Sequence, residues 1–244
     1  MQWCYWVPKK CISRVVGWFA HCRCRHLSRY LIRWYQSHFK ISLDEAVSSN
    51  VADYASLNDF FTRALKPGAR PIDTQPQVIV SPCDGVIGQI GHISGATLVQ
   101  AKGQHYTLDA LMAGLGDGVS PFINGRYVTI YLAPQAYHRV HMPMSADLVQ
   151  MKHVPGNLFP VFPKAVALVN DLYIRNERVL FWFETDRGPM VIAMVGALNV
   201  GSVTVSGYGQ VTSSKRTASQ WSYAEPISFQ KGDELAYFNM GGSC

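Results

Sequence analysis

Hydrophobic and polar residues follow two different patterns along this chain. Between residues 12 and 39, Leu27, Leu31 and Trp34 recur at the spacing i, i+4 and i+7, so they would share one face of a helix. Three cations recur on another face at the same kind of spacing: Arg25, Arg29 and Arg33. The pattern predicts one long amphipathic helix with a cationic stripe.

Two shorter helices are predicted next. Ser42, followed three residues later by Glu45, has the spacing of a capping box and predicts a helix start, and residues 57–63 predict another helix. Residues 66–71 are rich in Pro and Gly and end the helical pattern. We therefore divide the chain into a helical region, residues 1–65, and a second region, residues 66–244.

The second region consists of short apolar runs separated by Pro and Gly, a pattern typical of strands. The strands expected from these runs are residues 77–80, 86–93, 97–101, 127–132, 146–154, 178–184, 190–197, 200–205 and 228–239. One helix is expected near residues 107–115, and the polar residues 213–224 predict a surface loop. The fold class predicted is mostly β, with a sandwich-like or barrel-like core and a helical N-terminal region.

The charge is distributed unevenly. The chain of 244 residues has a net charge of +6, but residues 1–43 contain eight Lys or Arg and no acid, so the rest carries −2. Aromatic residues are interleaved with these cations, which suits the headgroup boundary of a membrane better than nucleic acid. We predict that residues 1–43 bind an anionic membrane surface; an ordinary basic helix packed on the domain is the alternative.

No apolar run approaches the roughly 18 residues that span a bilayer, so a peripheral location is predicted. No signal peptide is recognised, and disulfides are therefore not expected among the six cysteines. Cys22 and Cys24, with His21 and His26 nearby, have the wrong spacing for a structural zinc site, so no metal is expected.

Three segments could carry chemistry. Asp84 lies beside Gly85 at a strand entrance, where an acid is often only a turn residue. His138 and His141, three residues apart, can share a face of a turn, and imidazole suits general acid–base catalysis. Ser243 follows Gly242 near the end, where such a pair is often only a flexible tail. Taken together, Asp, His and Ser could form a set that activates a serine hydroxyl.

Longer motifs make a family resemblance specific. They occur in the family's order at residues 58–63, 84–87, 101–103, 137–143, 154–161, 175–179 and 195–202. On these motifs the chain resembles the pyruvoyl-dependent phosphatidylserine decarboxylases over about residues 12–243. The resemblance implies that residues 66–244 are the catalytic region and that they end at a self-cleavage site.

The resemblance also implies a mechanism. The proenzyme would cut itself between Gly242 and Ser243, and Ser243 would become the covalent pyruvoyl (pyruvate) cofactor, which accepts the electrons left by decarboxylation. His141, oriented by Asp84, would deprotonate Ser243, and His138 would deliver a proton to the α-carbon of the substrate.

The implied reaction converts phosphatidylserine to phosphatidylethanolamine. Leu158 and Phe159 would hold the acyl chains of the substrate; core packing is the alternative. The family continues past this serine as a small pyruvoyl-bearing subunit, of which only Ser243 and Cys244 are in this sequence, and Cys244 stands where the family has Thr. A homodimer and the cytoplasmic face of the cell membrane are further expectations.

Two other functions are left open. One is a pyruvoyl decarboxylase of a soluble amino acid, against which the basic and aromatic residues 1–43 argue. The other is a catalytically inactive, truncated homologue that binds lipid.

Overall fold

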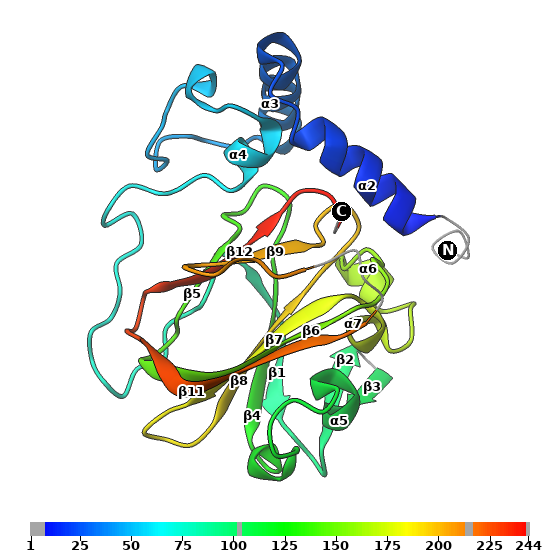
Figure 1. The fold of residues 1–244 in the computed structure, drawn as a ribbon, viewed down its shortest axis with the longest axis vertical. Helices are drawn as coiled ribbons and strands as arrows, with labels where there is room; N and C mark the ends of the chain where they lie inside the picture. The colour runs from blue at the N-terminus through cyan, green and yellow to red at the C-terminus, as the bar shows by residue number, and fades with distance from the viewer. Residues whose placement is uncertain (1–7, 102–103, 213–216, 243–244) are drawn as a thin grey trace.

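The computed structural model of the chain describes residues 8–101, 104–212 and 217–242. Helices α2 (Lys9–Ala20), α3 (Arg25–Phe39) and α4 (Leu57–Phe61) form a helical layer above the strands, with the short 3₁₀ helix η1 (Val51–Asp53) beside them (Figure 1). The prediction of one continuous helix over residues 12–39 is wrong, because the chain turns between α2 and α3.

This turn allows both helices to bury a face. The backbone N–H and Nδ1 of His21 lie 2.9 and 2.8 Å from the carbonyl oxygen of Gly17 and close the last turn of α2. Both helices then turn small or apolar side chains inward; the inward residues of α2 include Ser13, Gly17 and Ala20, and those of α3 are Ser28, Ile32 and Tyr35. A straight helix would carry only one of these two faces to the core.

The capping box predicted at Ser42 does not form a helix. The hydroxyl of Ser42 accepts a hydrogen bond from the backbone N–H of Asp44 at 3.1 Å and donates one to its carboxylate at 2.7 Å. Glu45 binds Arg70 instead of capping a helix. Helix α4, by contrast, begins as predicted, with the Ser56 hydroxyl accepting from the backbone N–H of Asp59 at 3.0 Å.

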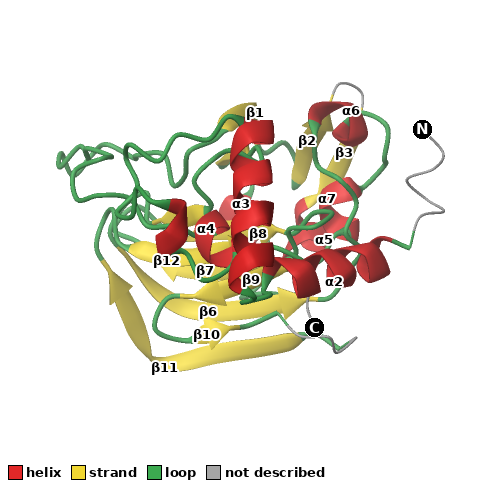
Figure 2. Ribbon diagram, turned by 90° about the horizontal axis from the view of Figure 1, so that it is seen from above, coloured by secondary structure: helices red, strands yellow, loops and turns green. Residues whose placement is uncertain are grey.

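Four antiparallel sheets follow (Figures 1 and 2). One four-stranded sheet has the order β10 (Gly209–Gln210), β9 (Ser202–Val205), β12 (Glu234–Asn239), β5 (Arg139–His141). The other has the order β11 (Ser219–Phe229), β6 (Ala146–Val154), β7 (Arg178–Glu184), β8 (Met190–Val195). The two smaller sheets pair β1 (Val86–His92) with β4 (Arg126–Tyr131) and β2 (Thr97–Ala101) with β3 (Gln104–Thr107). The remaining helices are α5 (Leu108–Met112), η2 (Ser120–Phe122), α6 (Pro163–Val166) and α7 (Leu172–Arg175).

The prediction of a mostly β fold is therefore confirmed, whereas within the described residues no sheet closes into a barrel. Residues 77–80 are not a strand; Val80 donates its backbone N–H to Pro143 outside the sheets. The strand expected at 228–239 is interrupted by a turn, in which the Asp233 carboxylate accepts the backbone N–H of Gln230 at 2.7 Å. Residues 219–224, expected in a loop, belong to β11.

Strand β7 shows how the core is built. Its odd-numbered residues Val179, Phe181 and Phe183 belong to the main apolar core, and its even-numbered residues Leu180 and Trp182 belong to a second apolar cluster. This alternation follows from the two-residue period of a strand. The main core also receives side chains from the other four-stranded sheet and from α2, α3 and α4, so the helical layer packs directly on the strands.

Candidate functional site

Strand β5 positions both candidate histidines. It is an edge strand of its sheet and pairs with β12, where Glu234 lies opposite His141. The backbone N–H of His141 donates to the carbonyl of Pro82 at 2.7 Å. Residues 82–84 therefore lie directly beside β5, and this contact brings the candidate Asp84 into the neighbourhood of His141.

The imidazole of His141 is held at both nitrogens. Nδ1 lies 2.8 Å from the carbonyl oxygen of Gly232, and Nε2 lies 3.0 Å from the hydroxyl of Tyr137. A carbonyl can only accept, so Nδ1 carries the proton and Nε2 accepts from Tyr137. The Tyr137 ring also stacks on His141, with centroids 5.7 Å apart. The arrangement leaves Nε2 as the nitrogen able to take up a proton.

Asp84 has a different partner. Its carboxylate accepts from Nε and Nη2 of Arg70 at 2.7–3.0 Å, and the same guanidinium binds Glu45. Hydrogen bonds to Asp84 and then Glu45 raise the pKa of Arg70 above its usual range. Among the described residues no hydrogen bond joins Asp84 to His141, so the structure places the two on adjacent segments without direct contact between their polar atoms.

His138 lies in a dry environment. Its side chain is 2 % exposed, and its ring stacks on Phe61 of α4, with centroids 3.9 Å apart. Burial lowers the pKa of His138 to about 3, against the opposing effect of the nearby Pro134 backbone. Neither ring nitrogen has a well-directed hydrogen-bond partner among the described residues. The two histidines therefore do not share one polar face, which the three-residue spacing had allowed.

The segment expected to carry the cleavage site continues from β12. This strand runs from Glu234, opposite His141, to Asn239, and Phe238 donates its backbone N–H to the carbonyl of His138 at 3.1 Å. At about 3.4 Å per residue, Asn239 lies about 17 Å farther along the strand than Glu234. The chain thus reaches Gly242 beyond the His138 end of β5, and Ser243 lies outside the described residues.

Gly241 and Gly242 are tightly enclosed. The backbone N–H of Gly241 donates to Asn199 at 2.7 Å, and its carbonyl accepts from Gly201 at 2.7 Å. Gly241 has a φ of 97°, and a β-carbon there would lie 2.5 Å from the α-carbon of Gly17. Only glycine combines this backbone conformation with so close a contact.

Leu158 and Phe159 are both buried in the structure, 1 % and 2 % exposed. A β-carbon on Gly242 would lie 3.3 Å from a methyl group of Leu158, so this side chain forms a wall of the glycine segment. The ring of Phe159 has the cations of Lys9 and Arg175 at 4.3 and 4.7 Å from its centroid. Their environment matches the core-packing alternative and leaves no open acyl-chain surface at these two residues.

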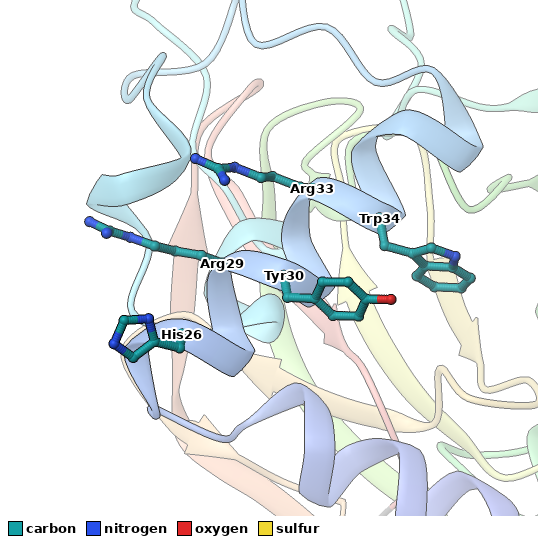
Figure 3. A pocket seen from close by; sticks show the side chains of 5 residues that line it. All are labelled: His26, Arg29, Tyr30, Arg33 and Trp34. Carbon is teal, nitrogen blue, oxygen red and sulfur yellow. The ribbon is translucent and has the colours of Figure 1, made fainter.

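The outer surface of the helical layer combines apolar side chains with cations. Several large apolar residues are exposed there: Ile12, Val15, Trp18, Phe19, Tyr30 and Trp34. An open hollow of about 500 Å³ is lined by His26, Arg29, Tyr30, Arg33 and Trp34. Figure 3 shows Arg29 and Arg33 extending the same way from α3, with Tyr30 and Trp34 on the other side. The predicted apolar face of α3 is partly exposed, since Leu27 and Leu31 are only half-buried and Trp34 is exposed.

No helix within the described ranges has the length and hydropathy that crossing a bilayer requires. Within the same ranges, no group of three or more His, Cys, Asp or Glu side chains is placed to bind a metal ion.

Sequence reasoning missed the partners of the candidate residues. Tyr137 and Gly232 hold His141, and Arg70 holds Asp84. Tyr137 is four residues before His141, inside a motif already noted, and could have been found there. Gly232 and Arg70 come from turns distant in sequence, so no local pattern indicates them.

Comparison with known proteins identifies the family. The family model described as phosphatidylserine decarboxylase matches residues 57–244, and a second model, described as PSD, matches residues 4–40. The phosphatidylserine decarboxylase proenzyme of Coxiella burnetii (strain RSA 331 / Henzerling II) is 40% identical over 239 residues, covering 98% of this chain and 85% of the relative. The proenzymes of Shewanella amazonensis and Pseudomonas putida (strain F1) are 41% and 40% identical, with the same coverage. The chain belongs to the phosphatidylserine decarboxylase family.

Proposed function

We propose that this chain is a proenzyme that cuts itself between Gly242 and Ser243 and then decarboxylates phosphatidylserine to phosphatidylethanolamine. The observation that carries the proposal is the enclosure of Gly241 and Gly242, in a chain of which 98% aligns with a phosphatidylserine decarboxylase proenzyme. A peptide bond that rearranges by itself must be held close to its reactive geometry. Backbone hydrogen bonds from Gly241 to Asn199 and Gly201 hold the residues before Ser243 in one position, which supports the proposal.

His141 is our candidate for the base that takes the proton of Ser243. The carbonyl of Gly232 fixes the proton on Nδ1, so Nε2 is the acceptor that this role requires, although Gly242 lies beyond the His138 end of β5 in this structure. Asp84 would support this histidine through the neighbouring segment, in which Pro82 accepts the backbone N–H of His141. The pyruvoyl group, once formed from Ser243, supplies an electron sink for the charge left when CO₂ departs.

His138 is our candidate for proton delivery to the α-carbon of the substrate. Burial keeps its ring neutral at neutral pH in this arrangement. A substrate carboxylate arriving within about 4–6 Å would favour the protonated ring. Substrate binding would therefore supply the charge that His138 needs in order to act as an acid.

Two substitutions in the full-length proenzyme, continued through its small subunit, test these roles. His141→Ala should remain a single chain on a denaturing gel, because the serine is not deprotonated. His138→Ala should yield two chains but little phosphatidylethanolamine from labelled phosphatidylserine. Normal cleavage of His141→Ala, or normal decarboxylation by His138→Ala, would show that the assignment is wrong.

We further propose that the helical region, residues 1–65, docks on an anionic lipid bilayer while residues 66–244 form the catalytic region. Helix α2 turns Ser13, Gly17 and Ala20 inward and leaves Trp18 69 % exposed and Val15 57 % exposed. A surface helix of a soluble protein normally turns its apolar side chains toward the core and its polar side chains toward water. A contiguous exposed apolar surface marks an interaction site. On the following helix, α3, Arg29 and Arg33 line the hollow together with Tyr30 and Trp34, and these cations make an anionic surface the fitting partner. The cytoplasmic face and a homodimer stay predictions of the family resemblance.

Liposome sedimentation tests this surface. Each basic residue near an anionic membrane contributes about 1 kcal/mol, so the double variant Arg29→Glu/Arg33→Glu should bind phosphatidylglycerol vesicles at least about tenfold more weakly. The matched control is Arg126→Glu/Arg187→Glu, which makes the same charge change at exposed residues of the β region. An equal loss of vesicle affinity in both variants would mean that net charge alone explains the binding, and it would reject the proposed surface.

A further inference from the structure

The glycine segment is held from the helical side as well as from the strands. The backbone N–H of Gly242 donates to the carbonyl of Ser13 in α2 at 3.2 Å. The Ser13 hydroxyl accepts the backbone N–H of Asn199 at 3.0 Å, and the Asn199 carbonyl accepts the backbone N–H of Gly241. Ser13 is completely buried. These hydrogen bonds connect α2, Asn199 and the two glycines before the proposed cleavage site.

Helix α4 contributes a second contact through Asn58. Its Oδ1 accepts the backbone N–H of Met240 at 2.8 Å, and its Nδ2 donates to Oδ1 of Asn239 at 3.0 Å. The Asn239 amide in turn donates to the Thr204 hydroxyl at 2.8 Å. One side chain of the helical region thus fixes two successive residues at the end of β12, three and two residues before Gly242.

We propose that Asn58 is a positioning residue for self-cleavage, holding the chain before Gly242 so that the Gly242–Ser243 peptide bond adopts its reactive geometry. The inference rests on the proposed self-cleavage. Asn58 acts through the backbone of Met240, and the Ser13 carbonyl holds the backbone N–H of Gly242 two residues later. Misplacing a reacting bond by about 1 Å lowers a rate on the order of 100-fold. Consequently, α2 and α4 form one wall of the cleavage site.

The test uses pulse-labelled full-length proenzyme, with conversion to two chains followed on a gel. Asn58→Ala should slow conversion at least about tenfold. Asn58→Asp keeps an acceptor for the backbone N–H of Met240 and should recover most of the rate. The control is Asn50→Ala, which removes an exposed asparagine that caps η1, with Oδ1 2.9 Å from Ala52 N, in the same region. This control should cleave at the parent rate.

A chemical readout separates positioning from general destabilisation. Hydroxylamine cleaves the ester formed when Ser243 Oγ attacks the Gly242 carbonyl, but it leaves the peptide bond intact. It should release small subunit from folded Asn58→Ala at least about tenfold more slowly than from the parent, because that variant forms the ester slowly. Parent-rate conversion of Asn58→Ala, failure of Asn58→Asp to recover any cleavage, or hydroxylamine release from Asn58→Ala at the parent rate would overturn the inference. If the parent proenzyme itself stays uncleaved, the proposed function fails instead.

Discussion

Burial of a neutral histidine should make the stability of this protein strongly dependent on pH. His138 is almost inaccessible, and burial lowers its pKa to about 3, whereas an unfolded chain has a histidine pKa of about 6.5. Between these two values the unfolded state binds a proton that the folded state does not bind. The free energy of unfolding therefore rises with pH across this window and falls as the solution is acidified.

The size of the effect follows from the two pKa values. Each pH unit inside the window changes the free energy of unfolding by about 1.4 kcal/mol. From about pH 7.5 to about pH 5, the loss due to His138 alone is about 2 kcal/mol. This is a large fraction of the total stability of a typical domain.

Urea unfolding followed by tryptophan fluorescence measures this loss. His138→Gln removes the titrating ring, so the free energy of unfolding of the parent minus that of the variant should fall by about 2 kcal/mol between these pH values. His92→Gln is the matched control, because His92 is exposed on β1 and its ring stays in water in both states. A difference between parent and His138→Gln that is independent of pH would refute the burial of a neutral ring.

Two further predictions concern groups outside the candidate catalytic residues. Asn176→Ala should lower the free energy of unfolding by about 3 kcal/mol. The buried Asn176 amide hydrogen-bonds the backbone N–H and carbonyl of Phe159 and the carbonyl of Gly196, and its loss leaves these groups unpaired. Urea titration measures the loss, and an equal loss in exposed Asn170→Ala would contradict the reasoning. Burial raises the pKa of Cys83 to about 11, so iodoacetamide at about pH 8 should label Cys83 more slowly than exposed Cys11. Peptide mass spectrometry measures the two labelling rates, and equal rates would contradict burial of the Cys83 thiol.

Strands β6 and β7 were predictable to the residue, and the reason is local. Strand β6 mixes apolar and polar residues between turn residues, and β7 is an apolar run buried on both faces. The missed features depend on contacts that the local pattern does not show. Glu45 binds Arg70, twenty-five residues away, and Ser42 hydrogen-bonds Asp44. The sequence has the spacing of a capping box, but no helix begins there.

The candidate site shows the same division between local and distant information. Motif residues 137–143 identified His138 and His141, but their spacing could not assign different environments to them. Phe61, which covers His138, and Gly232, which binds His141, are 77 and 91 residues away along the chain. Roles that depend on hydration and hydrogen bonding therefore require the fold, whereas the residue types that can perform them are visible in the sequence.

In the helical region, the composition of α2 is visible in the sequence, whereas the packing of its inner face requires the fold. Composition indicated a membrane-binding segment, but not that α2 would turn the small residues Ser13, Gly17 and Ala20 inward after Lys9. The close approach of Gly241 to Gly17 explains this, because a larger inward side chain at residue 17 would meet the backbone of the glycine segment. With small residues facing inward, the apolar side chains of α2, Trp18 among them, lie outside. The contact that encloses the proposed cleavage site therefore also accounts for the apolar surface that we propose docks on the membrane.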